Sequence, residues 1–328
     1  MPSTCEFYLS NHDGIYHSGD TVSCTIVLNT TKPKDVKEIT ITLLGQAYVK
    51  WTERERHGQT QTCVDYTAKE PYLDNTVTVS REGTLPAGFH TYKYDIVIPP
   101  ESRASYEGPD GHIRYELTLK LTRPYRSNNE FTKVLTVISK RDLNLNPVLR
   151  LPIENEEILT SFWCCGTGII NTKLKIPFGG YAIDQFVDYS VHVQNESKAD
   201  INSYTIQFIR KITFTSHKPK LKTRDEETTL FKKQHGVKCL RYTNRIFDGS
   251  FPIYDTPAST VGETIISVQY LLKVTLNMTC SNADTISIPI FVADIPFKER
   301  LVAAEPLETD PLTVPTVEEQ LSWISSAR

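Results

Sequence analysis

The chain has 328 residues, enough for about two domains, and with 39% apolar and 23% charged residues each domain can bury a core. The formal net charge of −3 gives no general attraction to nucleic acid or to an anionic membrane, so any electrostatic site must be local. The 16 Tyr and 13 Phe favour β structure, because aromatic side chains pack well on pleated surfaces.

The amino terminus, residues 1–6, has neither the charged nor the apolar region of a signal peptide. No run of apolar residues approaches the length of a membrane-spanning helix, which needs about 18 residues. The cysteines form an odd, unclustered set, which is typical of reduced thiols: Cys5, Cys24, Cys63, Cys164, Cys165, Cys239 and Cys280. We therefore expect a cytoplasmic protein.

Alternating apolar residues predict strands throughout the first 140 residues, over 22–28, 39–51, 77–80, 92–98, 113–121 and 131–138. Pro99 and Pro100 end one of these strands, and residues 106–111 have the composition of a turn. Residues 53–61 are polar and predict a hairpin loop. Short strands separated by turns, with no credible helix, favour an antiparallel immunoglobulin-like β-sandwich.

The pattern repeats in the second half. If Tyr16 is set on Tyr181, an offset of 165 residues, then Val22, Ile26, Val36, Ile41 and Leu43 fall on Val187, Val191, Ile201, Ile206 and Phe208. Later, an offset of 155 residues sets Tyr115 on Tyr270 and brings three apolar partners into register: Leu117, Leu119 and Leu121 on Leu272, Val274 and Leu276. Two homologous sandwiches in tandem account for this better than chance.

We therefore predict an all-β protein with a sandwich over 1–142, a linker over 143–152, a second sandwich over 153–297 and an acidic flexible tail over 298–328. Residues 266–276 and 286–292 are the clearest strands of the second domain, and Pro289 suggests that the latter lies at a sheet edge. In the tail, residues 316–324 could form a short helix.

The sequence contains no nucleophile elbow, phosphate-binding loop, dinucleotide fingerprint or HExxH motif, and its eight His are dispersed. Cys164 and Cys165 could be a redox or zinc pair, but a tetrahedral site needs two further ligands, and packed thiols are the better interpretation. We expect no catalytic residue, no cofactor and no metal.

One segment is locally basic. No acidic residue occurs over 201–224, whereas several cations do, and they could bind phosphates of lipid headgroups or of a phosphorylated cargo: Lys211, Lys218, Lys220, Lys222 and Arg224. The plainer alternative, which we favour, is a solvated hairpin tip. Arg210 falls on the apolar phase of its strand, which a bulge or a buried ion pair would explain. Trp51 could anchor a partner, but a Trp that ends an apolar strand face is more often core.

Three segments carry a family resemblance: Leu85-Pro-Ala-Gly-Phe-His, then Ile98-Pro-Pro, then Tyr106-Glu-Gly-Pro-Asp-Gly-His-Ile-Arg-Tyr. Together they resemble the arrestin amino-terminal domain, most closely that of the α-arrestins. Phe162-Trp-Cys-Cys-Gly-Thr-Gly resembles the start of the α-arrestin carboxy-terminal domain. The resemblance covers about residues 5–297.

The resemblance implies the arrestin fold and a non-enzymatic cytosolic adaptor. Such a protein binds cytoplasmic segments of membrane receptors and transporters, and directs their endocytic and endosomal trafficking at the plasma membrane and endosomes. α-Arrestins commonly recruit HECT-type ubiquitin ligases through PPxY motifs. This sequence has no PPxY, so ligase recruitment would need another contact.

An alternative of a different class is a redox-linked signalling regulator, since one α-arrestin relative binds thioredoxin through a cysteine. The candidate here is Cys239, whose pKa Lys238 and Arg241 could lower.

Overall fold

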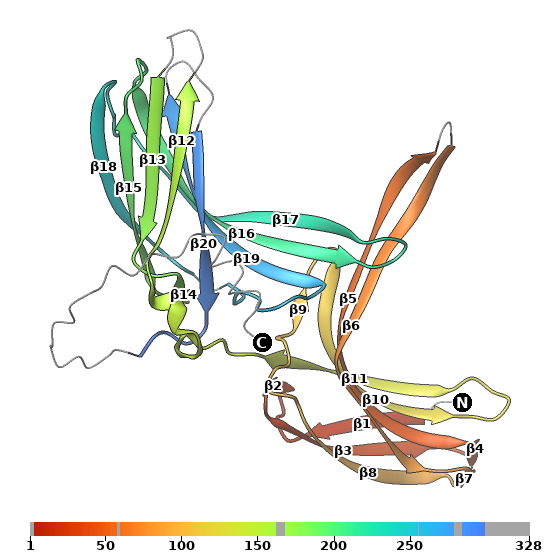
Figure 1. Cartoon of the computed structure of the whole chain (residues 1–328). Coiled ribbons are helices and arrows are strands. Elements are labelled where there is room, and N and C mark those ends of the chain that lie inside the picture. Colours follow the sequence, from red (N-terminus) through yellow and green to blue (C-terminus); the bar gives the residue numbers. More distant parts are fainter. Residues whose placement is uncertain (1–2, 58–59, 162–167, 255, 279–283, 299–328) are drawn as a thin grey trace. The chain divides into compact units, whose positions relative to one another are not determined.

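The computed structural model describes residues 3–57, 60–161, 168–254, 256–278 and 284–298 (Figure 1). The chain divides into two compact units. Unit 1 comprises Met1–Lys140 with Phe214–Arg224 and Thr264–Ile266, and unit 2 comprises Arg141–Thr213, Asp225–Glu263 and Ser267–Arg328. Most of the described chain is β-strand.

Unit 1 contains two main sheets. A three-stranded sheet has the order β1-β3-β8: Ser3–Leu9, Thr21–Thr30 and Gly88–Val97. A second sheet has the order β2-β11-β10-β5-β6: Ile15–His17, Asn129–Ile138, Gly111–Thr122, Glu38–His57 and Thr60–Ser80. β9 (Tyr106–Glu107) pairs with β10, and β4 (Lys34–Val36) pairs with β7 (Gly83–Leu85).

The second repeat forms two corresponding sheets. One has the order β12-β13-β15-β18: Ile153–Ser161, Gly168–Ile176, Phe186–Asn195 and Thr243–Pro252. The other has the order β14-β20-β19-β16-β17: Gly180–Ala182, Asp284–Ala293, Ile266–Met278, Ile201–Ser216 and Lys222–His235.

These topologies confirm the internal repeat. The order β1-β3-β8 recurs as β13-β15-β18, and β2-β11-β10-β5-β6 recurs as β14-β20-β19-β16-β17. Tyr16 and Tyr181, which the sequence offset superposes, occupy equivalent positions in the two repeats. Tyr16 pairs in parallel with Val137 of β11, and Tyr181 pairs in parallel with Val292 of β20. The two halves are therefore one sandwich design used twice, as the sequence offsets predicted.

The core of each repeat is formed by strands in which buried and more exposed side chains alternate. Along β10 every second side chain is buried, and Tyr115, Leu117, Leu119 and Leu121 are all 0% exposed. Their equivalents in β19 are 0–1% exposed: Tyr270, Leu272, Val274 and Leu276. Burying each such side chain stabilises the fold by about 1.5–3 kcal/mol, so these central strands contribute substantially to each core.

The predicted hairpin loop over 53–61 is wrong in extent. β5 continues to His57 and β6 starts at Thr60, so the strand predicted over 77–80 is only the end of a 21-residue strand. Polar residues on both faces conceal this extension, because period-2 alternation is visible only where one face is apolar.

Pro289 lies in β20, which is second rather than last in its sheet. The edge prediction nevertheless has a local basis. The neighbouring β14 pairs only with Phe291–Ala293, so Pro289 lies outside that pairing and its missing N–H interrupts no ladder there.

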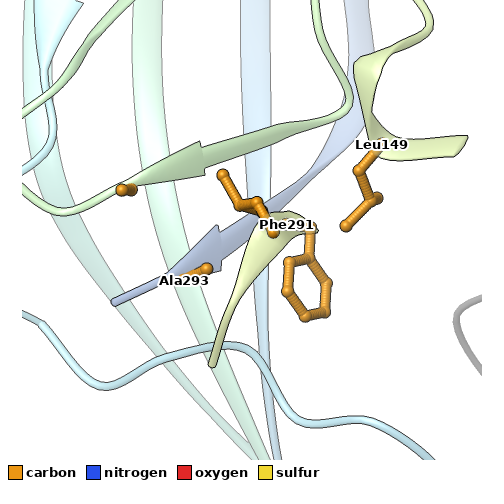
Figure 2. Packing of buried hydrophobic residues seen from close by; sticks show 5 residues of the cluster. Leu149, Phe291 and Ala293 are labelled. Carbon is orange, nitrogen blue, oxygen red and sulfur yellow. The ribbon is translucent and has the colours of Figure 1, made fainter. Parts of the chain in front are cut away.

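The segment predicted as a linker is structured and belongs to unit 2. It forms two 3₁₀ turns, η1 (Leu143–Leu145) and η2 (Pro147–Arg150), the only helical turns in the described part of the chain. Leu143 and Leu149 are buried in a cluster with Ala182, Phe291 and Ala293 (Figure 2). Gly180 permits this contact, since a Cβ there would lie 2.7 Å from Leu143 Cδ2 and 3.0 Å from Leu149 Cβ.

Some sequence predictions lie outside the described residues. They are the Cys164–Cys165 pair with most of its surrounding motif, the helix over 316–324 and the tail after Lys298.

Candidate functional site

The predicted basic segment is the turn between β16 and β17, and its central residues, 214–224, belong to unit 1. The backbone attaches it to β6. Thr67 N–H donates to the Lys218 carbonyl at 2.8 Å, and the N–H groups of His217 and Lys218 donate to the Thr67 carbonyl at 3.0 Å. Within the turn, Ser216 Oγ donates to the carbonyls of Lys220 and Lys222 at 3.1 and 3.2 Å. The turn is thus held by named hydrogen bonds.

Two of its cations meet carboxylates of β5. Lys220 Nζ lies 3.1 Å from Glu55 Oε1, and Lys222 Nζ bonds Glu53 Oε2. The ring of Tyr66 lies beneath them, with the Lys222 ammonium 4.9 Å from its centroid. The arrangement is an ion-paired cluster on an aromatic surface, and both attractions favour the charged forms.

The pKa shifts follow from these contacts. The hydrogen bond from Lys222 lowers the pKa of Glu53, and that from Tyr66, followed by that from Lys220, lowers the pKa of Glu55. The same pairs raise the pKa of both lysines. Near neutral pH all four groups are charged, and each positive charge has a negative neighbour.

Lys211 and Arg224 are paired as well. Arg224 Nη1 lies 3.1 Å from Asp110 Oδ1, and Lys211 Nζ lies 2.8 Å from Asp225 Oδ2. The hydrogen bond from Lys211 lowers the pKa of Asp225. The exposed side chain of Lys218 forms no ion pair with the described residues, and only its backbone is engaged.

The anion-binding role of Lys211, Lys218, Lys220, Lys222 and Arg224 therefore stays a prediction. A phosphate would have to displace a carboxylate from four of these five side chains. Sequence reasoning missed the partners Glu53, Glu55 and Asp110, because it placed them in loops. The alternation of Glu53-Arg54-Glu55-Arg56 was a usable signal, since it continues the period-2 pattern of β5.

Trp51 belongs to the core of unit 1, as expected. It is 3% exposed, its ring stacks on Tyr66 with centroids 5.4 Å apart, and its indole N–H donates to Glu53 at 2.8 Å. The Trp51–Tyr66 stack is the platform on which the ion-paired cluster rests.

Cys239 is 0% exposed. Its backbone pairs with Ile201 in both directions, and its Sγ lies 3.5 Å from the Thr243 carbonyl. Burial raises the pKa of its thiol, the opposite of the lowering expected from Lys238 and Arg241. Its redox role stays a prediction, and it would require this region to open first.

Arg210 keeps the inward phase of β16, because Phe208, Ile212 and Phe214 are buried on either side of it. The burial of these neighbours at two-residue spacing does not require a bulge at Arg210. At the repeat offset of 165, the equivalent of Arg210 is Gly45, which pairs with Tyr115. The equivalent of Tyr115, at the offset of 155, is Tyr270. Burial raises the pKa of Tyr270 to about 12, and the charge of Arg210 opposes this rise. The Nε of Arg210 is buried and has no hydrogen-bond partner in the part of the chain that the structure describes.

The described residues contain no group of three or more His, Cys, Asp or Glu that could hold a metal ion. Among them, no helix has both the length and the apolar character needed to cross a bilayer.

Comparison with known proteins decides the family. Residues 5–144 match the family "Arrestin (or S-antigen), N-terminal domain", and residues 166–297 match "Arrestin (or S-antigen), C-terminal domain". The chain belongs to the arrestin family. The two matches fall on the two repeats that the strand topology defines.

Its curated relatives are arrestin domain-containing proteins, the α-arrestins. "Arrestin domain-containing protein 17" of Caenorhabditis elegans is 25% identical, over 90% of this chain and 72% of its own length. "Arrestin domain-containing protein 1" of Homo sapiens is 23% identical, over 96% of this chain and 71% of its own length. "Arrestin domain-containing protein 4" of Mus musculus is 23% identical, over 87% and 70%. This arrestin-family chain resembles each of them along most of its length.

Proposed function

We propose that this protein is a non-enzymatic adaptor that binds cytoplasmic segments of membrane-protein cargo and directs their endocytic and endosomal trafficking. It would work in the cytoplasm, at the surfaces of the plasma membrane and endosomes. The observation that carries the proposal is the pair of matching sandwiches, each assigned to an arrestin domain. Arrestin-family proteins are generally non-enzymatic adaptors.

Sheet edges support a binding mechanism. β8 ends the three-stranded sheet of unit 1, and its repeat equivalent β18 ends the four-stranded sheet of unit 2. An edge strand offers unpaired N–H and C=O groups to an extended peptide, while neighbouring side chains provide specificity. Phe89 on β8 is 76% exposed and Ile246 on β18 is 58% exposed, so each edge presents a large apolar side chain to such a peptide.

Two finer elements belong to the proposal. The basic segment would favour an anionic membrane surface or a phosphorylated cargo, chiefly through Lys218, whose side chain is not already paired with a described carboxylate. A link to ubiquitination through a HECT-type ligase would use a contact other than PPxY, which this sequence lacks.

No observation favours the thioredoxin-binding alternative in the same way. Cys239 is buried and its thiol pKa is raised, so the thiolate that would attack or exchange with a partner is disfavoured.

The experiment is affinity purification of the tagged full chain from cells under mild lysis, with partners identified by mass spectrometry. We expect integral membrane proteins together with endosomal sorting factors, and a HECT-type ligase among them would indicate recruitment without PPxY. Recovery of thioredoxin or other soluble signalling proteins, without membrane cargo, would overturn the proposal.

Edge variants sharpen this test. Lysine beside a sheet edge disfavours strand addition, so Phe89→Lys and Ile246→Lys should each reduce cargo recovery if their edge is used. Tyr125→Lys is the matched control, because Tyr125 is fully exposed but lies between β10 and β11 rather than on an edge strand.

A further inference from the structure

Unit 2 contains an aromatic hollow beside β14 and η2. Its volume is about 380 Å³, within the range of ligand-binding pockets. Phe178, Phe186 and Phe297 provide apolar walls, and Arg150, Lys298 and Asp184 add charge. None of these residues belongs to the basic segment or to the edges discussed above.

Two of the walls of the hollow pack against other residues of unit 2. Phe297 packs against the buried cluster of Leu143, Leu149, Ala182, Phe291 and Ala293. Figure 2 shows this cluster, which joins η1 and η2 to the sheet. The Phe178 ring lies 6.3 Å from that of Phe297 and 6.1 Å from that of Tyr181, in the tilted and edge-on arrangements that aromatic rings prefer. Phe178 and Phe297 are therefore held by packing, whereas Phe186 is 63% exposed.

Arg150 is held in place by neutral groups. Its guanidinium carbon lies 4.6 Å from the centroid of the Phe297 ring, and Nη2 donates to the Lys298 carbonyl at 3.0 Å and to Asn144 Oδ1 at 3.4 Å. None of these three contacts is with a carboxylate, in contrast to Lys211, Lys220, Lys222 and Arg224. A fixed guanidinium fork without a carboxylate in these contacts is suited to receive one from a ligand.

The remaining polar groups of the hollow also favour an anionic ligand. Two cations, Arg150 and Lys298, face one carboxylate, Asp184, so the charge of the hollow is complementary to an anion. Tyr181 lines the hollow and is 4% exposed, and the hydrogen-bonding neighbour of its buried hydroxyl is the Phe178 backbone, in a geometry outside the ordinary range. Burial raises its pKa, so the hydroxyl stays protonated and able to donate.

The sandwich does not require these aromatic residues. At the repeat offset of 165, Phe178 and Phe186 correspond to Asp13 and Thr21, which are polar. The equivalent of Tyr181 is Tyr16, whose hydroxyl is engaged with Ser10 Oγ at 3.2 Å and the Asn11 N–H at 3.4 Å. The second repeat thus has an aromatic, cationic hollow where the first has a satisfied polar turn.

We propose that this hollow binds a short peptide segment of a partner protein in which an aliphatic or aromatic side chain adjoins a carboxylate. The apolar side chain would lie among Phe178, Phe186 and Phe297, and the carboxylate would accept from Arg150 and Lys298. The proposal stands apart from the cargo function, since an adaptor could use this site for a second partner and a protein of another function could have it too.

The test uses the purified full chain and a fluorescein-labelled ten-residue peptide that alternates Glu with Leu and Phe. Fluorescence anisotropy should show saturable binding that weakens roughly tenfold when Gln replaces each Glu, and is lost when Ser replaces Leu and Phe. Phe186→Ser and Lys298→Gln should each weaken binding at least about fivefold. Both side chains are exposed, so these variants keep the core, and an unchanged unfolding curve verifies this.

Lys232→Gln and Tyr254→Ser are matched controls, exposed and outside the hollow, and should not change binding. Equal binding by the hollow variants and these controls, or no binding by the full chain, would overturn the proposal. The proposal would also be overturned if the chain bound anionic phosphatidylserine vesicles instead of the peptide and this vesicle binding depended on Phe186. A further control labels the chain with 5-fluorotryptophan and records the fluorine signal of Trp323 without peptide. If the Phe186→Ser change moves that signal, the hollow binds the chain's own tail, and this result would also overturn the proposal.

Discussion

The two repeats share their strand orders but differ in what their turns present. In the first repeat, the turn before β3 is polar, and the Tyr16 hydroxyl is satisfied by neighbours. In the second, Phe178 precedes β14 and Phe186 begins β15, beside a guanidinium held by neutral groups. The basic segment of β16 and β17 differs again, because four of its five cations already meet carboxylates. Charge counted in a sequence is therefore not the charge available to a ligand.

The largest expected effect tests whether the repeats are separate cores. Leu117→Ala and Leu272→Ala remove equivalent side chains that are both 0% exposed, and each should cost about 2–5 kcal/mol through lost burial and a cavity. Hydrogen exchange read by mass spectrometry should find the loss confined to the repeat that carries the change. Equal destabilisation of both repeats by either variant would mean a single cooperative core.

A smaller effect should distinguish the repeats at one position. A Cβ on Gly45 would lie 2.3 Å from Tyr115 Cε1, so Gly45→Ala should destabilise the first repeat by about 1–3 kcal/mol through overpacking. Gly83→Ala is the control, because nothing lies within 4 Å of a Cβ there. Urea unfolding of both variants makes the comparison, and a Gly45→Ala protein as stable as Gly83→Ala would show that Tyr115 moves freely.

The pairing of Lys211 with Asp225 predicts a pH effect. The pKa of Asp225 is lowered when folded, so this pair adds stability above the ordinary carboxyl value of 3.8, and that stability is lost as the pH falls through the lowered pKa. Lys211→Met should reduce stability at neutral pH, and the two proteins should converge in acid. A difference that persisted in acid would assign the effect of Lys211 to packing.

The smallest effect concerns Glu53. Lys222→Met removes the largest cause of its lowered pKa, so carbon-detected NMR of the Glu53 carboxyl should find that pKa raised toward its ordinary value. The Trp51 indole still donates to Glu53, so a part of the lowering should remain. Lys232→Met is the control and should leave the Glu53 pKa unchanged.

Sequence reasoning succeeded where one strand face is apolar. The alternation along β10 and β19, and the two offsets that superpose them, predicted the paired sandwiches directly. It failed over Glu53 and Glu55, where both strand faces are polar, and over the linker, whose packing depends on the space that Gly180 leaves for Leu143 and Leu149. Side-chain pairings at long range were also out of reach, since Lys220 and Glu55 are 165 residues apart. No local pattern predicts such partners.

The most direct test of the adaptor assignment is binding between purified components. The purified full chain would be immobilised and exposed to synthetic cytoplasmic segments of the membrane proteins that it recovers from cells, each with a scrambled-sequence control. The account predicts that at least one segment binds saturably and better than its scrambled form. If none does, while a recovered soluble protein binds directly, the chain is not a cargo adaptor.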